Sequence, residues 1–220
     1  MHDLWNFQRV QRVALAPKLT LVVKYLVCFF STVRLYLIAG SRQLPGRLRP
    51  IQALNTMTTP PRHDARGVAN AILDYAATKD IALTPMQVIK LVYLCHGWSL
   101  ALHDGPMIDN QPQAWQYGPV YPHIYKAFKQ FGSRPISGRA RSRETGFPYE
   151  AKLTDDQRKL MHEVVDGYGH LKAFQLSNLT HQVGTPWQIS YNAGAYSQIS
   201  DELMKAHFEK LYDVRSTGTA

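Results

Sequence analysis

The sequence predicts a mainly α-helical fold, a compact single helical domain with one small irregular or β-hairpin arm. Three observations predict it. Apolar residues recur at helical spacing in the segments that follow residue 60. Two capping boxes, Thr84 with Gln87 and Thr154 with Gln157, mark the starts of helices. Residues 133–152 have no helical period and contain two glycines and two prolines, which are typical of an arm outside the helices.

The first two helices of the domain are predicted from their caps and their apolar residues. Residues 63–79 have Asp64 as an N-cap and one apolar stripe, which indicates an amphipathic helix. The capping box at Thr84 opens a second helix, with Pro85 at its first position, that extends to about residue 103. Its apolar residues lie almost all round, so we expect it to be the central, buried helix.

The next elements are less regular. Residues 107–118 form a connecting segment, in which we predict a short helix around residues 113–117. Gly118 and Pro119 are interpreted as a backbone corner that sets the start of the next helix. That helix, residues 121–132, places Tyr121, Ile124, Tyr125 and Phe128 on one face, and Gly132 ends it. The arm follows, as a small β-hairpin or a mobile loop.

Three further helices complete the domain. Thr154 caps the first of them, which Gly169 closes. Residues 173–182 form a short helix. Ser200 caps the last one.

Charge separates the first quarter of the chain from the rest. The formal charge is +9, but residues 1–56 hold eight bases against one acid, while residues 57–220 hold 17 bases against 15 acids. We therefore expect no nucleic acid as a partner of the domain. Four arginines nevertheless gather in the arm, where they touch phosphates or acidic groups of a protein partner, or belong to a solvated loop: Arg134, Arg139, Arg141 and Arg143.

Residues 1–56 are interpreted as an N-terminal extension that precedes a domain over residues 57–220. Residues 19–39 are long enough to span a bilayer but contain Lys24 and Arg34. We rank an upstream sequence read from a misassigned start first, with Met57 as the true start. A membrane anchor ranks second and a folded extension third. A membrane partner is expected only if residues 19–39 are a real span.

The cysteines and histidines predict no metal site and no disulfide framework. Cys28 and Cys95 lie far apart in the chain, which favours a reducing cytoplasm. Cys95 and His96 are neighbours on a helix and point about 100° apart, so they do not share one ion. No other histidine pair has ligand spacing.

Four sequence elements, in one order over some hundred residues, resemble the Panacea domain of SocA-like antitoxins, also described as phage-associated proteins of the GepA type. They are Lys90 to Tyr93 with Gly97-Trp98, the corner at 115–120, the Tyr-rich helix 121–132 and the segment 176–187. Ile89 stands where the family pattern has Gln. The residues that match the pattern, or lie within these elements, are the candidate binding residues: Lys90, Tyr93, Trp98, Trp115, Tyr117, Gly118, Pro119, His181, Pro186 and Trp187.

The resemblance implies a cytoplasmic antitoxin that captures a cognate protein toxin by direct binding, needs no cofactor and is not an enzyme. It also implies that the antitoxin can present the toxin to a ClpXP-type protease. The alternative is a small hydrolase or nuclease that uses His181 with Asp109, Asp155 or Asp156.

We expect different surroundings for the candidate residues. Trp98 belongs to the core, whereas Trp115 and Tyr117 are partly exposed at a loop. His181 is expected to bond a backbone carbonyl or to pack beneath Trp187.

Overall fold

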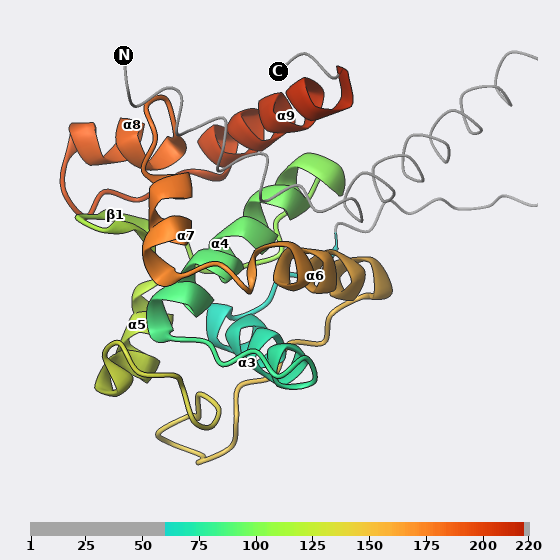
Figure 1. Ribbon diagram of the computed structural model, residues 1–220, viewed down its shortest axis with the longest axis vertical. Coiled ribbons are helices and arrows are strands. Elements are labelled where there is room, and N and C mark those ends of the chain that lie inside the picture. Colours follow the sequence, from blue (N-terminus) through green and yellow to red (C-terminus); the bar gives the residue numbers. More distant parts are fainter. Residues whose placement is uncertain (1–59, 218–220) are drawn as a thin grey trace, which may run out of the picture. The chain divides into compact units, whose positions relative to one another are not determined.

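The computed structural model describes residues 60–217, and α4 (Pro85–Leu102) lies at the centre of that part (Figure 1). Fifteen of its 18 residues are buried. It packs against α3 (Ala65–Ala77), α5 (Pro122–Phe128), α6 (Asp155–Tyr168), α7 (Ala173–Thr180) and α9 (Asp201–Thr217). The predicted central helix is therefore confirmed. Apolar residues occur around its whole circumference because other elements pack against it on every side.

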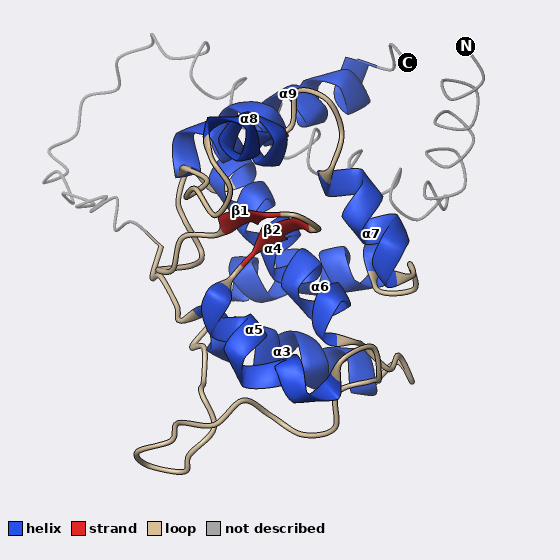
Figure 2. Cartoon of the chain, turned by 90° about the vertical axis from the view of Figure 1, so that its left-hand side faces the viewer, coloured by secondary structure: helices blue, strands red, loops and turns tan. Residues whose placement is uncertain are grey.

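The remaining elements are two short strands, a 3-10 turn and one more helix. They are β1 (Gln113–Trp115), β2 (Gly118–Val120), η1 (Lys129–Phe131) and α8 (Pro186–Ala193). The described residues are thus mainly helical, as predicted, with one small antiparallel hairpin at residues 113–120 (Figure 2). None of the helices between residues 60 and 217 is both long and apolar enough to cross a bilayer. The interpretations of residues 1–56 and of Met57 concern positions outside the described residues.

The predicted helix starts agree with the structure. The Asp64 side chain accepts a hydrogen bond from the backbone N–H of Arg66 at 2.8 Å, and complete capping boxes begin α4 and α6. The Ser200 hydroxyl accepts from the N–H of Leu203 at the start of α9. These caps satisfy backbone donors that the first turn of a helix leaves free.

The short helix predicted around residues 113–117 is wrong, because this segment is β1 and the turn that follows it. Trp115 pairs with Gly118, and Gln113 pairs with Val120. On its other side β1 pairs with a remote segment: the N–H of Ala114 donates to the carbonyl of Ser197, and the N–H of Tyr196 donates to the carbonyl of Ala114, both at 2.8 Å. This second partner lies some eighty residues away, so the local pattern could not indicate it.

The arm, residues 133–152, is held against α3. The side chain of Asn70, which is fully buried, donates to the carbonyls of Ala140 (3.0 Å) and Tyr149 (2.8 Å) and accepts from the N–H of Ala140 (2.7 Å). A single bridge joins Arg141 and Pro148, and no strand is formed in these twenty residues. The prediction of an irregular or β-hairpin arm is confirmed in its irregular form, and the bonds to Asn70 hold the arm in place, so that it is not a free loop.

Candidate functional site

The corner between β1 and β2, residues 117–119, is built around a buried amine. Lys90 comes from α4 and is only 1% exposed. Its Nζ donates to the carbonyl of Tyr117 at 2.8 Å and to that of Pro119 at 3.1 Å. Gly118 has φ +101°, and a Cβ at this position would lie 2.3 Å from Lys90 Nζ. The corner thus requires glycine for its backbone conformation and for the approach of Lys90.

Burial sets the protonation of two side chains at the corner. It lowers the pKa of Lys90 to about 7, and no acid among residues 60–217 forms an ion pair with this amine. Burial also lowers the pKa of His181, and the nearby Lys90 lowers it further. The buried Lys90 and the half-buried His181 therefore lie close enough for the amine to disfavour the charged form of the imidazole.

Two further helices hold the hairpin from the other side. The Ser177 hydroxyl on α7 donates to the carbonyl of Tyr117 at 3.0 Å, and the indole N–H of Trp187 on α8 donates to the carbonyl of Trp115 at 2.8 Å. The His181 ring stacks on Trp187 with 3.7 Å between centroids. The expected packing of His181 with Trp187 is confirmed, and its Nε2 is buried without a hydrogen-bond partner among the described residues.

Four aromatic residues at the hairpin are called here the hairpin face. Trp115, Tyr125 and Tyr196 have rings in contact, and Tyr117 is exposed at the turn between the two strands. The Trp115 ring meets Tyr125 edge-on at 5.1 Å and Tyr196 at 5.5 Å. Tyr117 is 63% exposed, Tyr196 64% and Tyr125 41%. Trp115 itself is half-buried, so the partial exposure expected for Trp115 and Tyr117 is confirmed.

The structure divides the candidate residues into two groups. One group surrounds the corner and includes Pro186, the buried first residue of α8: Lys90, Trp115, Tyr117, Gly118, Pro119, His181, Pro186 and Trp187. The other group, Tyr93 and Trp98, lies in the core, where both rings meet Phe208 of α9. Trp98 is 7% exposed, so its predicted place inside is confirmed.

Sequence reasoning missed two members of the hairpin face. Tyr125 was placed on the apolar face of its helix with Ile124 and Phe128, but it turns outward to Trp115. Tyr196 lies in the loop between α8 and α9 with φ +67°, and no spacing marked it. Its position depends on the pairing of its backbone with β1, which only the folded chain reveals.

The side chains that the enzyme alternative requires do not meet in the described part of the chain. No hydrogen bond or ion pair there joins His181 to Asp109, Asp155 or Asp156. Asp155 and Asp156 lie in the first turn of α6, where their negative charges interact favourably with the helix dipole. Burial raises the pKa of the Cys95 thiol, which disfavours the reactive thiolate.

Two other histidines form structural bonds. His96 Nδ1 accepts from the N–H of Ile108 and Nε2 lies 3.0 Å from Asp201, while His63 bonds Gln157 at 3.0 Å. No three His, Cys, Asp or Glu side chains between residues 60 and 217 are grouped so as to hold a metal ion. What the described residues do show is a corner held by hydrogen bonds from three helices, with exposed rings beside it.

Comparison with known proteins identifies one domain and one relative. Residues 88–188 match the family described as "Antitoxin SocA-like, Panacea domain". The chain is 30% identical over 154 residues to the antitoxin SocA of Caulobacter vibrioides (strain NA1000 / CB15N), which covers 66% of this chain and 82% of the relative. No solved structure matches the chain. The matched interval contains Lys90, the corner, His181 and Trp187.

Proposed function

Because this chain belongs to the SocA-like antitoxin family with a Panacea domain, we propose that it is an antitoxin that neutralises a cognate protein toxin by direct binding. Homology supports the antitoxin role in general. The proposal that binding is direct rests on one observation, the exposed aromatic rings of the hairpin face. Tyr and Trp side chains contribute most of the binding energy at many protein interfaces. Here Tyr117, Tyr125 and Tyr196 are exposed, and the rings of Tyr125 and Tyr196 contact Trp115.

The support behind the hairpin face favours tight binding. Lys90, Ser177 and Trp187 fix the backbone of the hairpin from three different helices. A surface that is already ordered loses less conformational entropy when it binds a partner. We therefore expect the rings to act as preorganised anchors within an interface of at least about 1,000 Å².

The proposed mechanism is occlusion with one antitoxin per toxin. It needs no nucleophile, cofactor or metal. The delivery of the captured toxin to a ClpXP-type protease, which resemblance to SocA-like antitoxins implies, is a second step of the same proposal. It requires that the complex leave part of the antitoxin or toxin accessible to the protease.

The proposal is tested with two matched aromatic variants. Tyr117→Ala removes an exposed ring from the hairpin face, and Phe147→Ala removes a ring that is 73% exposed at the end of the arm. Any small open reading frame that lies beside the gene is co-expressed as the candidate toxin, and the affinity of the purified pair is measured by calorimetry. We expect Tyr117→Ala to weaken toxin binding about tenfold or more without lowering the melting temperature. Phe147→Ala should leave the affinity for the toxin unchanged.

Two results would count against the proposal. Equal effects of the two variants would mean that the hairpin face is not the binding surface. Inactivation of the toxin by a small fraction of antitoxin, in the absence of protease, would require turnover and favour the enzyme alternative.

A further inference from the structure

The charge of the domain is unevenly divided along the chain. Residues 57–220 hold 17 bases and 15 acids, but residues 110–143 hold six of these bases and none of the acids. The rest of the domain therefore has 11 bases against 15 acids, a formal charge of −4. The basic stretch contains the hairpin, α5, η1 and the first half of the arm.

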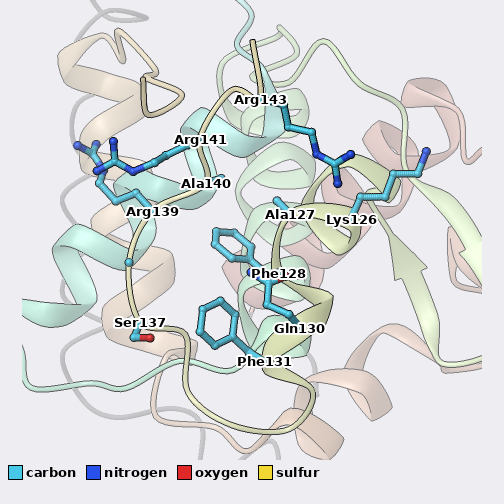
Figure 3. A pocket seen from close by; sticks show the side chains of 11 residues that line it. Lys126, Ala127, Phe128, Gln130, Phe131, Ser137, Arg139, Ala140, Arg141 and Arg143 are labelled. Atoms are coloured by element: carbon cyan, nitrogen blue, oxygen red, sulfur yellow. The ribbon is translucent and has the colours of Figure 1, made fainter. Parts of the chain in front are cut away.

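Most of these cations surround one pocket between the arm and the helical turns of α5 and η1. The pocket has a volume of about 340 Å³. Its wall contains two aromatic rings, of which Phe128 is buried and Phe131 half-buried. Figure 3 shows these rings between the cations that line it, which we call the arginine pocket: Lys126, Arg139, Arg141 and Arg143.

The fold holds the arginine side of the pocket in place. The Asn70 side chain bonds both the carbonyl and the N–H of Ala140, which lies between the arginines at 139 and 141. Arg141 donates to the carbonyl of Gly146 at 3.0 Å, which orients its guanidinium. The pocket thus exists before any partner arrives, and its ordering adds little to the free energy that binding requires.

The cations of the pocket are available to a partner. Arg139 forms an ion pair with Asp74 at 3.0 Å, but both side chains are more than one third exposed, so the pair is weak and easily exchanged. No acid among residues 60–217 pairs with Lys126 or Arg143, and both are exposed. Figure 3 shows the charged ends in two pairs, with Arg139 and Arg141 on one side of the rings and Arg143 and Lys126 on the other. Four positive charges around the rim of one pocket, of which only Arg139 has an ion pair among the described residues, attract an anionic group.

We propose that the arginine pocket binds a short acidic segment of a partner polypeptide. Carboxylates would meet the guanidinium forks, which can bind them through two parallel hydrogen bonds. An apolar side chain of the segment would lie against Phe131. A volume of about 340 Å³ suits a few side chains rather than a folded domain.

A nucleic acid fits the charge distribution less well. Duplex DNA carries a negative charge about every 1.7 Å, so it would extend from the pocket over the remainder of the domain. That remainder is net acidic and repels a long polyanion. A short acidic segment satisfies the basic stretch without reaching the acidic surface.

The test uses the full chain and a labelled peptide in which glutamates and aspartates flank one phenylalanine. Binding is measured by fluorescence anisotropy, with a peptide in which Gln and Asn replace the acids as a neutral counterpart. The pocket variant is Lys126→Ala with Arg143→Ala. The matched control is Lys129→Ala with Arg134→Ala, which removes the same charge from the same stretch but not from the pocket.

We expect about tenfold weaker binding in the pocket variant, which corresponds to about 1.4 kcal/mol, and little change in the control. All proteins in the comparison retain residues 1–56, so non-specific attraction by that basic segment cancels. The proposal is overturned if both variants weaken binding equally, if the neutral peptide binds as well, or if the acidic peptide does not bind. It is also overturned if a single-stranded oligonucleotide of equal charge binds more tightly and loses that binding in the pocket variant.

Binding of an acidic segment at the arginine pocket does not depend on the hairpin face. Tyr117→Ala should leave peptide binding unchanged, because Tyr117 does not line the arginine pocket. A failure of toxin binding at the hairpin face and a failure of acidic-peptide binding are thus observed in separate measurements.

Discussion

Substitution of Gly118 by alanine should destabilise the domain by about 2–6 kcal/mol. A non-glycine residue at φ +101° costs about 1–3 kcal/mol in backbone strain. The new Cβ would also lie 2.3 Å from Lys90 Nζ, so the amine must move away from its two carbonyl acceptors. A buried donor left without its bonds adds about 1–3 kcal/mol.

Gly138 provides a control with almost the same backbone conformation. Its φ is +97°, but a Cβ there would meet no atom within 4 Å. Gly138→Ala should therefore lose only the backbone contribution, about 1–3 kcal/mol. Urea unfolding followed by circular dichroism gives both free energies of unfolding. We expect the Gly118→Ala variant to be less stable than the Gly138→Ala variant by about 2 kcal/mol.

A double-mutant cycle isolates the contact with the amine. In a Lys90→Ala background, the added cost of Gly118→Ala should fall close to that of Gly138→Ala, because the nearest contact is gone and only Thr180 Oγ1, at 3.1 Å, still meets the new Cβ. Equal losses for the two glycine variants in the native background would refute the reasoning. So would an unchanged cost of Gly118→Ala when Lys90 is absent.

Three further outcomes are expected. Trp98→Ala should lower the free energy of unfolding by about 3–5 kcal/mol, because the ring is buried against Phe208; an unchanged urea midpoint would contradict this. The pKa of His181 lies below its usual 6.5 in the folded state, so the unfolded chain binds the proton first and stability falls as the pH drops below about 6.5. His181→Phe keeps the stacking on Trp187, so in urea unfolding at acidic pH it should lose less stability than the native chain, and it should retain toxin neutralisation. A folded variant that binds toxin but no longer protects would favour the enzyme alternative. A chain that starts at Met57 should rescue growth as well as the full chain, and a folded fragment without rescue would show that residues 1–56 contribute.

Local signals in the sequence were sufficient for most helices. The capping boxes at Thr84 and Thr154 act within one turn, so they predict a helix start wherever the chain folds. The apolar surface of α4 likewise predicted its central place. The start of α8 carries a similar signal, since Thr185 and Pro186 precede a Gln whose N–H bonds the Thr185 hydroxyl. That helix was missed although its pattern was present.

Contacts between remote segments decided the rest. β1 pairs with the adjacent β2 and also with residues 196–198, and no signal within residues 113–117 indicates that remote partner. Burial of Lys90 follows from the packing of the hairpin over α4, whereas a lysine in a sequence is ordinarily expected to be exposed. The exposed rings of Tyr125 and Tyr196 meet through Trp115 for the same reason. Capping and helical periodicity depend on neighbours a few residues away, but strand pairing, burial and a shared surface depend on partners that only the folded chain brings together.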